Sequence, residues 1–232
     1  MVNIVKEVLK VFSENHLWDD GIELIGSWCF ILYQKHFGVK YYPLRTQDMD
    51  FLISFPYKGK HKLDLINALE DIGFRKGFNP NGSIYLWNSE LKIEFIVPQR
   101  GKGIDDTIKI KDLSVVAETL RYMDILLDHP VIINEEGIEI NIPEPSAFFI
   151  HKLLIVKNRK NKEKKLKDLE QIMCLIETVK KEDIKKIFNT LPKGWQRDII
   201  LSLEESKRLF PNKKSLIDDI VITLQNLKNN KK

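Results

Sequence analysis

The first 142 residues contain short hydrophobic runs of two kinds. Runs with helical spacing predict helices, whereas alternating or continuous apolar runs of about four to eight residues predict strands. The predicted helices cover residues 2–15, 28–37, 61–71 and 115–127. The predicted strands cover residues 22–25, 45–55, 83–87, 91–97, 108–110, 130–134 and 138–142. This part of the chain therefore mixes both kinds of element.

The segment Pro143-Glu144-Pro145 interrupts this pattern, and beyond it the hydrophobic spacing is helical to the end of the chain. The predicted helices there cover residues 146–156, 164–179, 182–189, 197–209 and 214–227. The pattern predicts an α+β protein in which an α/β domain of residues 1–142 precedes an all-helical C-terminal domain of residues 143–232.

The composition is that of a globular protein, with 43% hydrophobic and 30% charged residues. The apolar runs are far shorter than the roughly 20 residues that span a bilayer, so no contact with a membrane is expected. Charges at Lys6, Glu7 and Lys10 interrupt any signal peptide. Cys29 and Cys174 are the two cysteines, too few for a disulfide framework or a Cys-rich zinc site. A cytoplasmic location is expected.

The charge is distributed unevenly along the chain. Residues 143–232 hold 21 Lys and Arg against 12 Asp and Glu, whereas residues 1–142 hold 16 against 21. An acidic part joined to a basic part fits a metal-carboxylate site beside a surface for polyanions. The alternative is that lysine-rich helices simply have solvated faces.

The basic residues are densest between residues 157 and 167, where seven Lys and Arg accompany Glu163. This segment is a candidate for binding the phosphate backbone of RNA. It lacks interleaved aromatic residues, so base stacking is not indicated there. An exposed basic loop without a ligand is the alternative.

Three acidic residues on predicted strands form a candidate metal site. Asp48 and Asp50 are one residue apart, so both carboxylates leave the same face of a strand, about 7 Å from each other. Such hard oxygen ligands suit Mg²⁺, which takes its other ligands from water and phosphates. Glu94 lies on a later strand and becomes a third acid if that strand is a neighbour. Three such carboxylates are typical of two-metal phosphoryl or nucleotidyl transfer.

A possible phosphate site precedes the acids in the chain. Gly26 and Ser27 form a turn at the start of a predicted helix, where backbone N–H groups and the serine hydroxyl favour a phosphate. Arg45 lies three residues before Asp48 and could contact phosphate oxygens with both arms of its guanidinium group. Each feature alone has a simpler explanation, because a Gly-Ser turn often only caps a helix and Asp-x-Asp often lies in a solvated loop.

Taken in order, these motifs resemble a known family. Gly26-Ser27 followed by Asp48-Met49-Asp50-Phe51 resembles the polymerase-beta-like nucleotidyltransferase signature, in which an apolar residue and Gly-Gly or Gly-Ser precede Asp-x-Asp-x. Residues 26–33, 45–50 and 94–98 are similar to a bacterial branch related to the abortive-infection (type IV toxin) nucleotidyltransferases. Residues 143–168 also resemble the C-terminal motifs of that branch. No P-loop, Gly-x-Gly-x-x-Gly, Cys-x-x-Cys or Gly-x-Ser-x-Gly motif points elsewhere.

The resemblance implies a nucleotidyltransferase-type mixed sheet flanked by helices. It also implies transfer of a nucleoside monophosphate from an NTP to an acceptor, with Mg²⁺, two ions of which act during turnover. The resemblance assigns catalysis and metal binding to Asp48, Asp50 and Glu94. It assigns nucleotide binding to Gly26, Ser27, Arg45, Thr46, Lys152 and Asp168.

The resemblance also suggests partners. They are the NTP substrate, an RNA or tRNA acceptor held by segment 157–167, and a protein antitoxin if the protein acts as a toxin.

Alternatives remain open for the residues of the helical part. Lys152 could extend its charge from the edge of a helix, and Asp168 could form an ordinary helix-surface pair with Lys164. His151 is expected to be a packed or surface residue, not a metal ligand. Two alternatives to this function are a non-catalytic module that binds RNA or a protein, and a small-molecule nucleotidyltransferase of the antibiotic-modifying kind.

Overall fold

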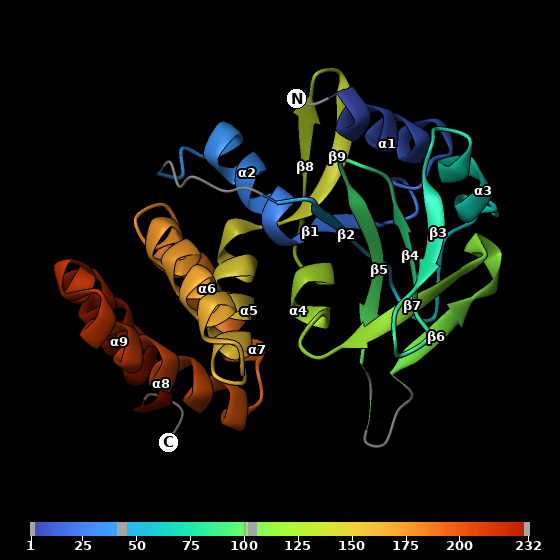
Figure 1. Ribbon diagram of the computed structural model, residues 1–232. Coiled ribbons are helices and arrows are strands. Elements are labelled where there is room, and N and C mark those ends of the chain that lie inside the picture. The colour runs from blue at the N-terminus through green and yellow to red at the C-terminus, as the bar shows by residue number, and fades with distance from the viewer. Residues whose placement is uncertain (1–2, 41–45, 100, 102–105, 230–232) are drawn as a thin grey trace. The chain divides into compact units, whose positions relative to one another are not determined.

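The computed structural model describes residues 3–40, 46–99, 101 and 106–229 (Figure 1). The chain divides into two compact units. The first comprises residues 1–31 and 44–143, and the second comprises residues 32–43 and 144–232. The second unit thus includes a short segment from the N-terminal half of the chain. The division into domains at residue 143 stays a prediction.

Within the described residues, the first unit contains a mixed sheet of seven strands. The strands are β1 (Glu23–Ile25), β2 (Asp48–Leu52), β3 (Arg75–Phe78), β4 (Ile84–Trp87), β5 (Lys92–Pro98), β6 (Thr107–Ile110) and β7 (Val115–Leu120). Five of them follow the order β1-β2-β5-β4-β3, and β7 pairs with both β5 and β6. The pairs β2–β5 and β5–β7 are parallel, and the others are antiparallel.

Strand β5 lies at a branch point of the sheet. One of its edges pairs with β2 along residues 92–96. The other edge pairs with β4 over residues 92–94 and with β7 over residues 96–98. Because β5 has neighbours along both edges, side chains on it are held in a fixed position relative to those on β2.

Helix α1 (Asn3–Glu14) covers the buried face of the sheet. The Phe12 ring stacks on Phe51 of β2 with 3.9 Å between ring centroids, and Phe51 lies 6.5 Å from Phe95 of β5. All three side chains are almost completely buried. This aromatic row leaves the opposite sheet face for polar residues. Helix α3 (Leu65–Glu70) packs beside α1 and β3.

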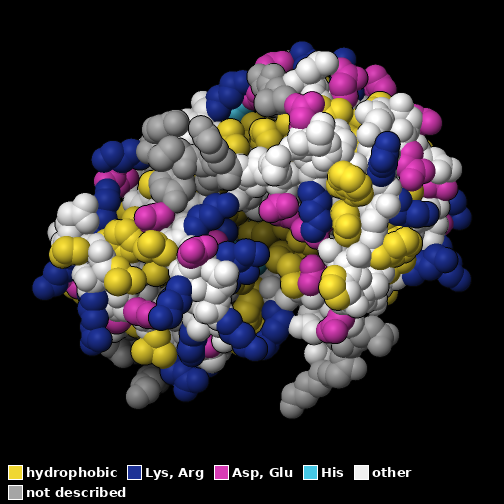
Figure 2. Space-filling view, in the orientation of Figure 1, with side chains coloured by type: hydrophobic (Ala, Val, Ile, Leu, Met, Phe, Trp, Pro, Cys, Tyr) yellow, Lys and Arg dark blue, Asp and Glu magenta, His cyan; other side chains and the backbone are white. Residues whose placement is uncertain are grey.

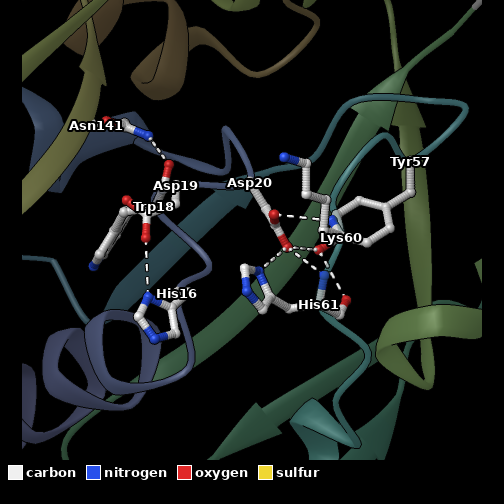
Figure 3. A network of polar contacts seen from close by, with 8 residues as sticks. All are labelled: His16, Trp18, Asp19, Asp20, Tyr57, Lys60, His61 and Asn141. Carbon is white, nitrogen blue, oxygen red and sulfur yellow. Dashed lines mark hydrogen bonds and ion pairs between the residues drawn. The ribbon is translucent and has the colours of Figure 1, made fainter.

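Asp20, between α1 and β1, anchors the segment that leaves β2 (Figure 3). Its carboxylate accepts hydrogen bonds from the Tyr57 hydroxyl at 2.7 Å and from the backbone N–H groups of Lys60 and His61 at 2.9 and 3.1 Å. The His61 ring nitrogen Nδ1 lies 3.0 Å from the same carboxylate. Although burial alone would raise the pKa of Asp20, these hydrogen bonds hold it below its ordinary value.

These bonds also explain why α3 is shorter than the predicted helix at 61–71. The backbone of residues 60–61 is bound to Asp20, and the helix begins only after Asp64, whose side chain accepts from the Asn67 N–H at 3.1 Å.

The predicted helix over residues 115–127 is wrong in its first half. Residues 115–120 form strand β7, in which Val115, Ala117 and Thr119 are buried while the alternate residues are not. Residues 115–120 form a strand because their backbone N–H and C=O groups pair with β5 and with β6, and this pairing outweighs the local helix preference. Only the short helix α4 (Asp124–Leu127) remains. Strand β3 was not predicted, because its mostly polar sequence lacks hydrophobic alternation.

A hairpin of β8 (Pro130–Glu135) and β9 (Ile138–Pro143) completes the first unit. Its turn residues Glu136 and Gly137 have φ of 52° and 89°, as in a tight two-residue turn. Asn141 on β9 donates to the backbone carbonyls of Trp18 at 2.6 Å and Ile22 at 3.2 Å, the first of which is drawn in Figure 3. These bonds tie the hairpin to the residues before β1.

The second unit is helical, as its sequence predicts. Its helices are α5 (Pro145–Val156), α6 (Lys162–Leu175), α7 (Lys181–Thr190), α8 (Lys193–Leu209) and α9 (Lys214–Asn229), joined by the end of α2 (Gly26–His36). Helix α5 packs against α6, α7 and α8, and Ser202 of α8 donates to the Leu153 carbonyl at 2.8 Å. The Tyr33 ring of α2 meets the Phe148 ring edge-on at 5.3 Å. The prediction of an α+β protein with a mixed sheet and a helical C-terminal part is confirmed.

Candidate active site

Two rows of side chains run across the strands on the sheet face opposite α1. Residues that are partners across neighbouring strands point to the same face. The first row therefore runs from Arg75 through Trp87 and Lys92 to Asp48. The second row contains the residues two positions away on these strands, namely Gly77, Tyr85, Glu94 and Asp50, together with Ile25 of β1, the partner of Asp50. The three acids of the predicted site thus lie on one sheet face.

Asp48 and Asp50 leave β2 on the same side, as their spacing predicts. Asp48 is exposed and Asp50 is half-buried, whereas Met49 between them is completely buried. Asp50 is also the direct partner of Glu94 on the parallel strand β5. The carboxylates of Asp48, Asp50 and Glu94 therefore point away from the core, while the side chains on the opposite face of the same strands are buried in it.

The Glu94 carboxylate has two partners within the first unit. Lys92, two residues earlier on the same strand face, places its ammonium nitrogen 2.7 Å from Oε1. The Asn79 side chain donates to the same oxygen at 3.1 Å and to the Ser83 hydroxyl at 2.9 Å. Glu94 is therefore oriented by its neighbours, and its charge is balanced by Lys92.

The turn between β1 and α2 lies directly against Asp50. Gly26 has φ of +70°, a conformation that side chains with a Cβ rarely adopt. A Cβ on Gly26 would stand 2.3 Å from Oδ2 of Asp50. Ser27 follows in the first turn of α2. The start of the helix, where backbone N–H groups lack helical partners, is thus next to the acid pair.

Thr46 holds the backbone at the entrance to β2. Its hydroxyl oxygen accepts from the Asp48 N–H at 3.2 Å and lies 3.3 Å from the Asp48 carbonyl, to which it can donate. Thr46 is therefore beside the acid pair and fixes the first residue of the pair. Arg45 lies outside the described residues.

Lys152 and Asp168 belong to the second unit and bind each other. The Lys152 ammonium lies 2.5 Å from Oδ1 of Asp168, and Nε of Arg159 lies 2.8 Å from Oδ2. Burial alone would raise the pKa of Asp168, but the two cations outweigh it and hold the pKa below its ordinary value. Asp168 pairs with Lys152, sixteen residues away, and not with Lys164 as in the helix-surface alternative.

His151 is buried, the first of the two positions, packed or surface, that the sequence left open. Burial lowers the pKa of its ring to about 3, and the charge of Lys152 adds to this effect. The imidazole ring is therefore neutral, because burial disfavours its charged form.

Two charged residues close to Glu94 on the sheet face were missed from the sequence. Lys92 could have been noticed from its spacing of two from Glu94 on a predicted strand. Glu118 could not, because it falls in the segment predicted as a helix; it lies on β7 opposite Ile96 of β5. Burial raises the pKa of Glu118, and the Glu94 carboxylate raises it further, against the opposing charge of Lys92. The face thus carries a fourth acid.

The carboxylates of the sheet face suit one kind of metal site. In the part of the chain that the structure describes, no group of three or more His, Cys, Asp or Glu side chains is arranged to hold a metal ion. The pair Asp48 and Asp50 does supply two hard oxygen donors on one face, while Glu94 is engaged by Lys92. This set fits an ion such as Mg²⁺ that binds two protein carboxylates and completes its shell with water and phosphate oxygens.

The basic segment 157–167 is partly neutralised by α8. Lys157 pairs with Asp198, and Lys165 lies 2.7 Å from Glu205. Figure 2 shows the same mixture, with acidic side chains scattered among the Lys and Arg side chains of the helical unit. The cations of this segment that lack an ion pair within the described residues include Lys160, Lys162 and Lys164.

None of the described helices is long and apolar enough to cross a membrane. No curated protein matches the sequence.

Similar folds occur among solved structures. An antigenic nucleotidyltransferase-like protein from Paracoccidioides brasiliensis aligns with a TM-score of 0.51 and 13% identity, over 92% of this chain and 93% of that chain. The antibiotic-resistance factor ANT(2'')-Ia aligns with a TM-score of 0.48 and 11% identity, over 89% and 96%. At these identities the first likeness shows the fold alone, and the second adds nothing to the argument.

The family itself is shown by the sequence. A family model described as "Nucleotidyltransferase" matches residues 3–193, a span that includes the turn at Gly26, the acid pair and Glu94. Of the resemblances stated above, the one to nucleotidyltransferases is thereby confirmed, whereas the abortive-infection branch stays a prediction. The chain belongs to the nucleotidyltransferase family.

Proposed function

We propose that this protein transfers a nucleoside monophosphate from an NTP to an acceptor hydroxyl and releases pyrophosphate. The observation that carries the proposal is the contact between the turn at Gly26 and the Asp50 carboxylate. It brings a phosphate-binding helix start and an acid pair together on one face of the sheet, in a chain of the nucleotidyltransferase family.

In this proposal Asp48 and Asp50 hold Mg²⁺, two ions during turnover. When bound, these ions neutralise the triphosphate and stabilise the charge that develops at the attacking and leaving oxygens. Ser27 and the backbone N–H groups at the start of α2 bind the β- and γ-phosphates. Thr46 keeps Asp48 in place, and Arg45 steadies the triphosphate.

Glu94 is proposed to accept the proton of the acceptor hydroxyl. The acceptor oxygen then forms a bond to the α-phosphorus, and the bond between the α-phosphorus and the bridging oxygen breaks. Pyrophosphate leaves with that oxygen and its electron pair. Glu94 suits this role because Lys92 and Asn79 orient its carboxylate from one side.

The acceptor is proposed to be RNA, with Lys160, Lys162 and Lys164 of segment 157–167, which have no ion pair among the described residues, contacting its phosphates. A contribution of Lys152 and Asp168 to the nucleotide or acceptor site stays a prediction, since both charges are already satisfied within the helical unit. The toxin role, a protein antitoxin and the cytoplasmic location rest on the sequence alone and stay predictions.

Transfer of label tests the proposal. The purified protein is incubated with each α-labelled NTP and Mg²⁺, and with total RNA, cellular protein or an aminoglycoside. Asp48→Asn serves as the inactive variant, and Asp71→Asn, an exposed aspartate at the end of α3, serves as its matched control. We expect labelled RNA with the wild type and with Asp71→Asn, and none with Asp48→Asn.

Each other outcome has a definite meaning. Labelled aminoglycoside would identify the antibiotic-modifying alternative, and labelled protein would replace RNA as the acceptor. Absence of transfer to any of the three, together with failure to bind Mg²⁺-NTP, would favour the non-catalytic binding module.

A further inference from the structure

A pocket of about 480 Å³ opens at the Asp48 end of the first row. Its lining includes Asp48, Phe78, Tyr85, Trp87, Asn88 and Lys92, all from the first unit. Pockets of roughly 300–1,000 Å³ are typical of small-molecule sites. The pocket therefore has room for a ligand the size of a nucleoside, next to the first acid of the pair.

The aromatic side chains of this pocket are unusually exposed. Trp87 is 43% exposed, and Tyr85 on the same face of β4 is half-buried. Phe78, at the end of β3, is 64% exposed but is the partner of Ile84 and so belongs to the opposite sheet face. The Tyr85 ring lies over Gly77, where a Cβ would stand 2.4 Å from the ring. Large aromatic surfaces that stay in contact with water within one pocket indicate a place where a ligand stacks.

The position of Trp87 relative to Asp48 suits an acceptor. Trp87 is the partner of Lys92, and Lys92 is the partner of Asp48, so two strand spacings, about 10 Å, separate Trp87 from the acid pair. A planar group stacked on Trp87 would extend a hydroxyl towards Asp48. Residue 92 lies between them on β5, and its ammonium reaches the second row, 4.6 Å above the Tyr85 ring and 2.7 Å from the Glu94 carboxylate.

The polar groups of the pocket favour a nucleobase over a polycationic sugar. Gln47, Asn88 and Ser89 line it and offer both donors and acceptors, which match the hydrogen-bonding edges of a base. Oδ1 of the Asn88 side chain accepts from the backbone N–H groups of Glu90 and Leu91, both at 2.8 Å, so this rim is held in shape and Asn88 can offer its side-chain N–H groups to a ligand. A polycation would instead require several acids, whereas the lining holds two, Asp48 and Glu90, together with the cation Lys92.

We propose that this pocket is the acceptor site and that it binds a nucleobase stacked on Trp87. The inference rests on the proposed function, because it names the acceptor of the same reaction. The nucleobase could belong to a free nucleoside or to the end of an RNA strand, and the experiment below separates these two sources.

Binding is measured without NTP and in the presence of EDTA, so that it does not depend on transfer. The probe is a short, fluorescein-labelled single-stranded RNA followed by anisotropy, with unlabelled adenosine and uridine as competitors. Trp87→Ala removes the ring on which a base would stack, and this loss should weaken RNA binding at least about 5-fold. Trp87→Phe keeps a ring and should retain most of the affinity. Ile132→Ala removes another exposed apolar side chain of the same unit and should bind as the wild type does.

Equal affinity of the wild type and Trp87→Ala, or no binding of RNA and nucleosides, would overturn the acceptor pocket. Unlabelled RNA is a further competitor. Displacement of the labelled RNA by nucleosides at concentrations comparable to those of unlabelled RNA would assign the pocket to free nucleosides, and displacement by unlabelled RNA but not by nucleosides would assign it to an RNA end.

The transfer assay separates this inference from the proposed function. Transfer that Trp87→Ala leaves unchanged would overturn the pocket and keep the nucleotidyltransferase. RNA binding that depends on Trp87, without transfer by any NTP, would keep the pocket as a nucleobase site and overturn the proposed reaction.

Discussion

Gly26 and Asp50 are in such close contact that a side chain on residue 26 would require the Asp50 carboxylate to move. Oδ2 of Asp50 occupies the space 2.3 Å from the position of a Cβ at residue 26. The glycine thus serves two purposes, since it permits φ of +70° and leaves the acid its place beside the helix start.

Gly26→Ala is therefore expected to displace Asp50 and to lower kcat at least about 100-fold, because misplacement by about 1 Å can have an effect of this size. Gly21→Ala is the matched control, since Gly21 has φ of +78° with nothing within 4 Å of a Cβ. Both variants should lose about 1–2 kcal/mol of stability from backbone strain. Measurement of kcat and of thermal unfolding checks this, and equal kcat values for the two variants would contradict it.

Activity and stability should change in opposite directions when either acid of the pair is neutralised. Asp48→Asn and Asp50→Asn should lower transfer at least about 100-fold, equivalent to about 2.7 kcal/mol of transition-state stabilisation. Without metal, their melting temperatures should equal that of the wild type or exceed it by up to about 4 °C, because repulsion between the acids is relieved. A large fall in melting temperature for both variants would instead indicate structural residues.

Glu23 makes stability depend on pH in a direction that can be worked out. Burial, together with the charge of Asp128, raises the pKa of Glu23 to about 8 from 4.5. The folded state therefore keeps a proton that the unfolded chain releases above pH 4.5. The free energy of unfolding should fall as pH rises from about 4.5 to 8 and then level off, as far as this residue is concerned.

Glu23→Gln removes this titration and should be more stable than the wild type at pH 8, with little difference at pH 4. Urea unfolding at several pH values measures the difference. A difference that stays constant between pH 4 and 8 would show that Glu23 is ionised in the folded protein.

The buried pair of Lys152 and Asp168 should behave as a unit. Asp168→Leu leaves a buried ammonium without its main partner and should lower the free energy of unfolding by about 3–5 kcal/mol. Adding Lys152→Met should restore more than half of that loss. Lys164→Met, at the exposed position of the helix-surface alternative, should change stability by less than about 0.5 kcal/mol. Additive losses in the double variant would contradict the pair.

The acid pair could be predicted from the sequence because strand alternation is a local rule. Asp48, Met49 and Asp50 reveal their faces by their spacing alone. The partners of Glu94 could not be predicted in full, since the Asn79 side chain comes from a loop and reaches Glu94 only after β4 and β5 have paired. The pair of Lys152 and Asp168 likewise forms only when α5 packs against α6.

Segment 115–120 shows the limit of hydrophobic spacing. Val115-Val116-Ala117-Glu118 holds both β-branched residues and good helix formers, so its local preference is ambiguous. Pairing with β5 and β6 decided it. For this reason the sequence did not predict that Glu118 lies on the polar sheet face.

The alternation along β2 also has a consequence for folding. If β2 paired with β5 one residue out of register, Asp48 and Asp50 would enter the core, and the fully buried Met49 and Phe51 would face water. Two charges without hydration would make that misalignment far less stable than the native pairing. Asp48 and Asp50, which are proposed to bind the metal ions, thus also favour the native register of β2 and β5. An inserted or deleted residue in β2 should harm this protein more than a substitution at either aspartate.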